Sequence, residues 1–208
     1  MSGRRQPQLE LTAGYRLRPW STTDAPDMVI GMRDALVRQY AGQLIDERQG
    51  ALAALHSWAD QWQEGLGAAW AICEPGRQIV GSVRFGLVDP EIRTGSVGYW
   101  LLPAGRGRGL ASNALATATQ LVFERLRWHR VELYHAVENE RSCGVAKRAG
   151  YPQEGVLRSA MRYPVDGRRS DEHLHARLIT DPSPSLTMIR RPYGIAATRP
   201  ERGPTGAR

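Results

Sequence analysis

The stretch that most constrains the fold covers residues 96–120, SVGYWLLPAGRGRGLASNALATATQ. Its first seven residues are mostly apolar and aromatic, which is typical of a buried strand. Pro103 ends that strand, because proline has no N–H to give to a ladder. A glycine-rich segment follows, and behind it apolar residues recur at helical spacing, namely Leu110, Ala114, Leu115, Ala118, Leu121 and Val122. The pattern predicts a strand, a glycine-rich turn and a helix in succession.

The predicted turn has the properties of an anion site. The first N–H groups of a helix have no partner inside it, and the helix dipole places partial positive charge there. Glycine lets the backbone approach a ligand closely, so the turn suits a phosphate group, and Arg106 and Arg108 add charge. The spacing GxGxG matches neither the GxxxxGK[ST] nor the GxGxxG nucleotide loop. The alternative interpretation is an ordinary glycine-rich connection between a strand and a helix.

Three motifs together resemble one enzyme family. Residues 106–111, RGRGLA, match the (Q/R)xxGx(G/A) signature of the GNAT acyltransferase superfamily. Downstream, residues 139–142 (NERS), 149–151 (AGY) and 154–158 (EGVLR) resemble the N-x-x-S, L-G-F and E-G-x-x-R run of the branch that contains the ribosomal-protein alanine and serine N-acetyltransferases. The similarity covers about residues 14–180.

The resemblance implies a mixed α/β fold. In this family a central, twisted and mostly antiparallel sheet is flanked by helices, and its fourth and fifth strands splay apart at a bulge, here near Trp100 and Leu101. The pantetheine arm of acetyl-coenzyme A inserts between them, and the glycine-rich loop binds the pyrophosphate. The first two helices and the loop between them, about residues 37–47, cover the acceptor site.

Composition bounds the domain organisation. The 208 residues, 41% of them hydrophobic, suffice for one domain with a core, and no apolar run reaches the length of a membrane span. The net charge of +7 lies partly in the two ends of the chain, and we interpret it as an aid to solubility, the alternatives being a contact with coenzyme A phosphates or with nucleic acid. We expect a flexible N-terminus over residues 1–13, the acetyltransferase domain over 14–180, and a disordered tail over 181–208, which is rich in proline, arginine and glycine.

The first residues, MSGRRQPQ, have no apolar segment behind the arginines and so do not resemble a secretory signal. Two cysteines are too few for a disulfide framework, which favours a reducing, cytoplasmic location. We expect no membrane partner, because no apolar run is long enough to span a bilayer. Nucleic acid is not expected either, because no basic-aromatic repeat joins the six tryptophans. A monomer or a homodimer is expected.

Periodicity and turn residues predict the remaining elements. Helices are expected from residue 25 to beyond 36, over 48–64, from 110 to near 127, and over 140–148. Strands are expected over residues 15–18, 68–73, 78–87, 96–102 and 131–137, followed by a hairpin of 153–163 and 172–179.

The resemblance also implies residue roles. The residues expected to bind acetyl-coenzyme A are Trp100, Leu101, Leu102, Arg106, Gly107, Arg108, Gly109, Leu110, Ala111, Asn139 and Ser142. Backbone groups of Leu101 and Leu102 are expected to bond to pantetheine, and Asn139 to contact the same arm, although a plain helix cap is its alternative role. Ser142 matches the serine that protonates the leaving thiolate, the alternative being a residue of the first helical turn.

The general base departs from the family pattern. Some ribosomal enzymes carry a glutamate seven residues after the glutamate of E-G, but here that position holds Met161. A neighbouring branch has a glutamate and a tyrosine where this chain has Tyr134 and Ala146. A water relay, Tyr134 and His135 remain as candidates, although a tyrosine near its ordinary pKa is a poor base at neutral pH.

Other reactive side chains are interpreted as structural. His173 and His175 share one strand face, but no third ligand has convincing spacing, so we expect a half-solvated strand and no metal. Cys143 is expected to be packed, because the family transfers the acyl group directly.

The sequence therefore predicts an acetyl-coenzyme A-dependent N-acetyltransferase. The acceptor is a primary amine, with a peptide or protein N-terminus as the leading interpretation. A small-molecule amine, such as an antibiotic or metabolite, is the first alternative. A weakly catalytic acyl-coenzyme A-binding module is the second, and the donor could carry a succinyl or other acyl group.

Overall fold

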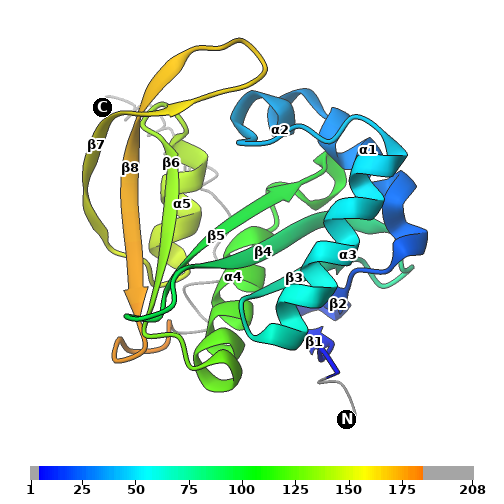
Figure 1. Ribbon diagram of the computed structural model, residues 1–208, viewed down its shortest axis with the longest axis horizontal. Helices are drawn as coiled ribbons and strands as arrows, with labels where there is room; N and C mark the ends of the chain where they lie inside the picture. Colours follow the sequence, from blue (N-terminus) through cyan, green and yellow to red (C-terminus); the bar gives the residue numbers. More distant parts are fainter. Residues whose placement is uncertain (1–4, 185–208) are drawn as a thin grey trace, which may run out of the picture.

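A computed structural model describes residues 5–184, which form one eight-stranded sheet with helices on both faces (Figure 1). The strand order is β1-β2-β3-β4-β5-β6-β8-β7, and every neighbouring pair is antiparallel except β5 and β6, which are parallel. The strands are β1 (Leu9–Glu10), β2 (Arg16–Pro19), β3 (Gly67–Cys73), β4 (Ile79–Asp89), β5 (Thr94–Leu101), β6 (Arg130–Ala136), β7 (Gln153–Arg162) and β8 (Arg169–Leu178). The predicted mixed α/β class is confirmed.

Helices α1 and α3 lie on one face of the sheet, and α4 and α5 lie on the other (Figure 1). The helices are α1 (Ala25–Arg33), α2 (Ala35–Tyr40), α3 (Arg48–Glu64), α4 (Leu110–Leu121) and α5 (Glu140–Arg148). Short 3₁₀ turns occupy Thr12–Gly14, Thr22–Asp24 and Pro103–Gly105, and a π-helical turn occupies Val122–Leu126. Within the described part of the chain, no helix is both long enough and apolar enough to cross a bilayer.

Local signals placed most boundaries correctly. The helices α3 and α5 have the predicted ends, and the predicted strands agree with the observed ones to within three residues. The first helix does not continue past Leu36 as one piece, because Asp34 is not helical and its side chain caps α2 by accepting from the backbone N–H groups of Leu36 and Val37. The α-helical part of α4 ends at Leu121, and the π-helical turn carries the chain on toward the predicted end near Arg127.

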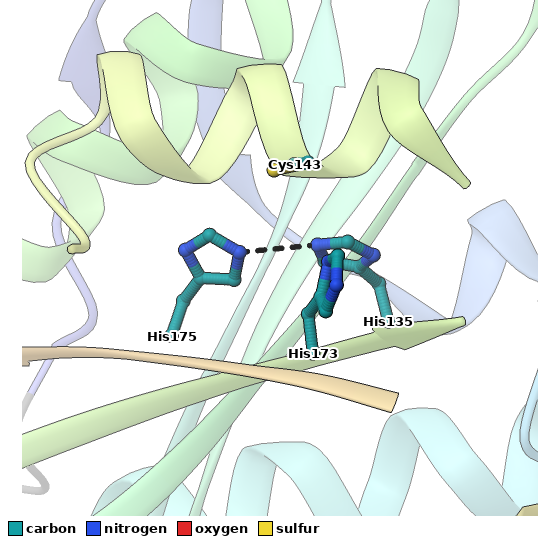
Figure 2. Close-up of side chains that lie close together, drawn as sticks. All are labelled: His135, Cys143, His173 and His175. Atoms are coloured by element: carbon teal, nitrogen blue, oxygen red, sulfur yellow. Dashed lines mark hydrogen bonds between the residues drawn. The ribbon is translucent and has the colours of Figure 1, made fainter. Parts of the chain in front are cut away.

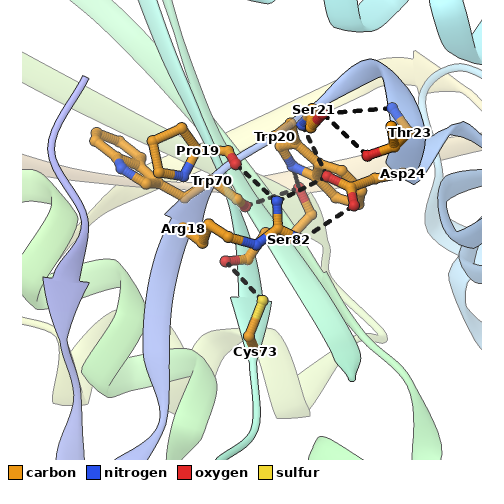
Figure 3. A network of polar contacts seen from close by, with 10 residues as sticks. Arg18, Pro19, Trp20, Ser21, Thr23, Asp24, Trp70, Cys73 and Ser82 are labelled. Atoms are coloured by element: carbon orange, nitrogen blue, oxygen red, sulfur yellow. Dashed lines mark hydrogen bonds and ion pairs between the residues drawn. The ribbon is translucent and has the colours of Figure 1, made fainter. Parts of the chain in front are cut away.

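The junction between β2 and α1 is fixed by a polar network (Figure 3). Arg18 forms an ion pair with Asp24, whose carboxylate also accepts from the backbone N–H of Ser21 at 2.7 Å. The indole N–H of Trp20 donates to the hydroxyl of Ser82 on β4 at 3.2 Å. These bonds satisfy the start of the helical segment and fix the position of α1 over the sheet, where its residue Met32 lines the cleft described below.

Strands β5 and β6 pair only at their beginnings. The register joins Thr94–Ser96 to Arg130–Glu132, after which β5 stays with β4 and β6 stays with β8. The predicted splay of these two strands is therefore present. The expected bulge near Trp100 and Leu101 is wrong, because the β4–β5 register is unbroken there and shifts only between Leu87 and Asp89.

A tryptophan holds the two strands together where they do pair. Trp128, fully buried, lies just before β6, and a Cβ added at Gly95 would come within 2.2 Å of its ring. The backbone N–H of His129 donates to the carbonyl of Arg93 at 2.9 Å. Packing and hydrogen bonding thus join the strands at one end only, and the gap opens toward their other ends.

The N-terminal prediction needs correction for residues 5–13. Strand β1 pairs with β2, Leu11 is buried in the core, and the indole N–H of Trp70 donates to the carbonyl of Pro7 at 2.9 Å. The polar composition of this segment suits an edge strand, because β1 has a neighbouring strand, β2, along only one of its edges. Most of the expected tail, residues 181–208, lies outside the described residues. Within its first part, Asp181 accepts from the backbone N–H of Leu178 at 2.8 Å.

Candidate active site

A cleft of about 1230 Å³ opens where β5 and β6 diverge. Its walls are the glycine-rich turn before α4, the splayed strands, the start of α5, the hairpin of β7 and β8, and the loop after α2. The residues proposed from sequence that line this one cleft are Trp100, Leu101, Arg106, Gly107, Gly109, Leu110, Ala111, Tyr134, His135, Asn139 and Ser142. Leu102 and Arg108, which were also proposed from the sequence, are not among the described residues that line the cleft.

The glycine-rich turn presents backbone to the cleft. Gly107 and Gly109 have φ angles of 75° and 70°, a left-handed conformation that side chains with a Cβ rarely adopt. A Cβ added at Gly107 would meet no atom within 4 Å, so this glycine faces open space. Helix α4 begins directly afterwards at Leu110, and its first turn lines the cleft, so the geometry is that of a helix N-terminal anion site.

The two arginines of the turn are bound to other parts of the fold. The Nε of Arg106 donates to the carbonyl of Leu101 at 2.9 Å, and its guanidinium pairs with Asp34. Burial raises the pKa of Asp34, but the bonds from Arg106 and from two backbone N–H groups outweigh it and lower that pKa. Arg108 donates to the hydroxyl of Tyr15 at 2.7 Å. The arginines therefore brace the turn, which is a different role from the expected direct charge on phosphate.

Leu102 has a similar structural role. Its N–H donates to the carbonyl of Val80 on β4 at 2.8 Å, on the side away from the splay. This N–H is therefore not free for the backbone contact to pantetheine expected at Leu101 and Leu102. Sequence reasoning missed one cation beside the first turn of α4. Arg148, in the last turn of α5, lines the cleft and donates to the hydroxyl of Ser112 at 3.2 Å.

Ser142 has a partner that the sequence did not suggest. The hydroxyls of Ser142 and Tyr99 lie 2.8 Å apart, and Ser142 itself is buried. Burial raises the pKa of Tyr99 to about 12, with the bond to Ser142 acting in the opposite direction. The tyrosine is therefore neutral at pH 7 and can donate a proton. Alternation along β5 places Tyr99 beside the splay, but the contact with α5 depends on tertiary packing.

Asn139 acts as the cap of α5. Its side-chain oxygen accepts from the backbone N–H of Ser142 at 3.2 Å, which satisfies one unpaired group of the first turn. The residue also lines the cleft in which the resemblance places the pantetheine arm. Both roles weighed from the sequence are therefore geometrically compatible.

Both candidate bases on β6 are engaged with neighbouring side chains. The hydroxyl of Tyr134 donates to Glu132, and burial together with that carboxylate raises its pKa to about 12. His135 is buried, its Nδ1 lies 2.8 Å from the carbonyl of Ala136 and its Nε2 lies 3.2 Å from Nε2 of His175. Burial lowers the pKa of His135. These contacts argue against both residues as the general base.

The opposite end of the cleft contains a carboxylate that the sequence analysis missed. Glu172 on β8 is buried, lines the cleft and accepts from the hydroxyl of Tyr163 at 3.2 Å. Burial raises its pKa, and the bond from Tyr163 lowers it. Met161, which stands where some relatives carry a glutamate, also lines this end, and Gly42 of the loop after α2 packs against its methyl group. The β6–β8 register, which pairs Glu172 with Ala136, was the missing signal.

The loop after α2 forms a wall at the Glu172 end of the cleft. Its residues Ala41, Gly42, Gln43 and Ile45 line the cleft, as the expectation for residues 37–47 requires. Tyr40 packs edge-on against Tyr163 at a centroid distance of 6.1 Å. The expectation of a half-solvated strand for His173 and His175 is wrong for His175, which is fully buried.

Comparisons with known proteins agree with this geometry. Residues 15–152 match the acetyltransferase (GNAT) domain family. The uncharacterized N-acetyltransferase YoaA of Bacillus subtilis is 25% identical over 62% of this chain and 73% of its own length. The ribosomal-protein-serine acetyltransferase of Escherichia coli is 29% identical over 49% of this chain, and the match spans little more than half, 56%, of that relative.

Solved structures share the fold. A ribosomal-protein-S5-alanine acetyltransferase from Vibrio fischeri has a TM-score of 0.77 at 19% identity and covers 85% of this chain and 98% of its own. The ribosomal L7/L12 acetyltransferase RimL, solved in complex with coenzyme A, has a TM-score of 0.74 at 20% identity and covers 83% of this chain and 98% of its own. With a family match over most of the chain and the splayed strands beside a glycine-rich turn, this chain belongs to the GNAT acetyltransferase family, whose co-substrate is acetyl-coenzyme A.

Proposed function

We propose that this enzyme moves an acetyl group from acetyl-coenzyme A to the N-terminal amine of a peptide or protein, by direct attack in a ternary complex. The observation that carries the proposal is the continuity of the cleft, which runs from the turn at Gly107 through the splay to Glu172. Its volume of about 1230 Å³ exceeds the range of about 300–1,000 Å³ typical of a single small-molecule site, and so suits two substrates.

The donor arm fits the open edge of β5. Beyond Ser96 this strand pairs with β4 on one side only, so its other edge offers backbone groups to an extended chain with amides of its own, such as pantetheine. The pyrophosphate would then lie at the turn of Gly107 and Gly109, where the first N–H groups of α4 face the cleft. Both interactions use backbone atoms, so they depend on the fold more than on particular side chains.

The reaction breaks the C–S bond of the thioester and forms a C–N bond with the amine. The amine loses one proton, and the leaving thiolate gains one. In our proposal the hydroxyl of Ser142 gives a proton to the leaving thiolate. Tyr99, which is neutral and hydrogen-bonded to Ser142, can then return a proton to Ser142. Glu172 accepts a hydrogen bond from the amine at the acceptor end, and the released proton passes to solvent.

A peptide acceptor is favoured by the form of the acceptor end. The loop after α2 and the β7–β8 hairpin form its walls, with the aromatic rings of Tyr40 and Tyr163 packed against each other between them. Among the relatives, one is named a ribosomal-protein-serine acetyltransferase, which supports a protein N-terminus as the acceptor class. The small-molecule alternative has its own support, since one fold neighbour is a microcin C7 self-immunity acetyltransferase.

The test is an acceptor screen that follows free thiol release. Short peptides beginning with serine or alanine would be compared with small primary amines, using acetyl-, propionyl- and succinyl-coenzyme A as donors. We expect kcat/KM for the best peptide to exceed that of the small amines by at least about 100-fold, because the remote contacts of a peptide supply binding energy. The same peptides with a blocked N-terminus are the control and should give no release. Faster turnover of a small amine would favour the alternative, and no turnover of any amine would favour a binding module.

A further inference from the structure

Three histidines and a cysteine converge behind the wall of the cleft. His135 comes from β6, His173 and His175 from β8, and Cys143 from α5, and Figure 2 shows Cys143 on the helix directly above the three imidazoles. One potential ligand atom of each residue lies within 4.8 Å of the others. The chain has five histidines, and these are the three that cluster.

The sheet register produces this cluster. His135 and His173 are directly opposite each other on β6 and β8, and His175 follows two residues later on the same face. Helix α5 packs over that face and brings Cys143 to it. Residues up to 40 positions apart in sequence therefore meet at one point.

The hydrogen bonds leave two lone pairs facing each other. Nδ1 of His135 lies 2.8 Å from the carbonyl of Ala136, and Nδ1 of His175 lies 3.0 Å from the carbonyl of Tyr151. A carbonyl can only accept, so both Nδ1 atoms carry the proton. In two neutral imidazoles both Nε2 atoms are then unprotonated, and they lie 3.2 Å apart. Such an arrangement is repulsive unless a cation or an additional proton lies between the two nitrogens.

The two facing nitrogens lie away from bulk water, because His175 is fully buried and His135 is nearly so. The repulsion between their lone pairs is therefore little screened. His173 adds a further unsatisfied atom, since its Nδ1 is buried and has no hydrogen-bond partner among the described residues. A bond from Nδ1–H to a backbone carbonyl is also the usual way in which a protein orients a histidine for metal coordination.

We propose that His135, His173, His175 and Cys143 bind a divalent zinc ion. Zinc takes four nitrogen or sulfur ligands in tetrahedral geometry, with Zn–N near 2.0–2.1 Å and Zn–S near 2.3 Å. Those lengths imply about 3.3 Å between two nitrogens and about 3.6 Å between nitrogen and sulfur. The observed 3.2 Å between His135 and His175 fits, and the 4.8 Å limit for the whole set needs only small side-chain adjustments.

The proposed zinc has a structural role. Four protein ligands complete its coordination, so no position remains for a substrate, and acetyl transfer itself needs no metal. The ion joins β6 and β8, the strands that diverge from β5, to α5. Helix α5 begins beside Asn139 and contains Ser142. Cys143 and His173 are only partly buried, which provides a path for entry. The zinc would fix the position of Ser142 relative to β6 and β8, whatever the acceptor.

The test measures metal binding to the full chain without an affinity tag, after treatment with a chelator. Zinc would be titrated against a chromophoric chelator, and cobalt would be used as a spectroscopic probe. We expect one equivalent of sub-micromolar zinc, a rise in Tm on addition of zinc, and a thiolate-to-cobalt charge-transfer band that identifies Cys143 as a ligand. No stoichiometric binding, or a cobalt spectrum without the thiolate band, would overturn the four-ligand site and leave a proton-sharing histidine pair.

Variants locate the site. Cys143→Ser and His173→Gln should each weaken zinc binding by at least about 100-fold, since even changes outside the ligand set cost about 10–100-fold. His129→Gln and His56→Gln remove the two exposed histidines outside the cluster and should bind zinc as the unaltered chain does. Zinc affinity that survives both cluster variants, or that falls equally in the control variants, would overturn the proposal. If a cluster variant fails to fold, the cobalt spectrum of the unaltered chain still decides.

Discussion

Replacing Gly107 by alanine separates ligand binding from fold stability, because the chain contains a matched control. Gly107 and Gly65 both have a φ of 75°, and a Cβ added at either meets no atom within 4 Å. Gly107 lines the cleft, whereas Gly65 ends α3 and is not among the lining residues that the structure describes. Gly107→Ala and Gly65→Ala therefore impose the same backbone strain, and only the first places a methyl group where the pyrophosphate is proposed to bind.

The stability effect should be small and shared. A side chain in the left-handed region costs about 1–2 kcal/mol. The reduced freedom of the unfolded chain returns about 0.4–1 kcal/mol. The net loss of about 1 kcal/mol corresponds to a fall in Tm of about 2–4 °C for a chain of this size. Both variants should show it.

The affinity effect should appear at Gly107 alone. A methyl group that prevents close approach of a phosphate loses about one hydrogen bond to a charged group, worth about 1.5–3 kcal/mol. That energy corresponds to a rise of about 10–100-fold in the Kd for coenzyme A. Calorimetry of coenzyme A binding and thermal unfolding of each variant are the two assays. An unchanged Kd in Gly107→Ala, or the same loss in Gly65→Ala, would refute the assignment of the turn as the pyrophosphate site.

Three further predictions concern side chains. Ser142→Ala and Tyr99→Phe should each lower kcat by about 100-fold in steady-state assays, and the double variant little further, because their hydroxyls act as a pair. Since the pKa of Tyr99 is about 12, this effect should be constant from pH 7 to about 10, and a fully active Ser142→Ala enzyme would contradict the role. Glu172→Gln should raise the acceptor KM by about tenfold and leave the Kd for coenzyme A unchanged, and a change in that Kd alone would place Glu172 elsewhere. Asp34→Asn keeps the α2 cap but loses the ion pair to the partly exposed Arg106, so chemical denaturation at pH 7 should show a loss of about 0.5–1 kcal/mol. The pKa of Asp34 is lowered in the folded state, so the ion pair stabilises the fold fully above the unfolded-state pKa and loses this effect as the pH falls through the folded-state pKa. The free energies of unfolding of Asp34→Asn and of the unaltered chain should therefore converge in acid.

The helices, the strands and the glycine-rich turn could be predicted from the sequence because their signals are local. Apolar periodicity set the ends of α3 and α5, and proline and glycine marked the turn before α4. The motif around Asn139 and Ser142 likewise predicted a helix start beside the cleft. Each of these inferences uses residues a few positions apart, where spacing alone decides which side chains share a face.

Tertiary structure decided which side chains meet. The β6–β8 register placed Glu172 in the cleft and brought His173 and His175 to His135, although the sequence had suggested a half-solvated strand. Packing of α5 on the sheet brought Ser142 to Tyr99, which lies 43 residues earlier. Arg106 illustrates the same limit, because its charge fitted a phosphate until the fold supplied Asp34 as its partner. Register and burial are properties of the assembled sheet, so no local pattern encodes them and only the folded chain reveals these pairs.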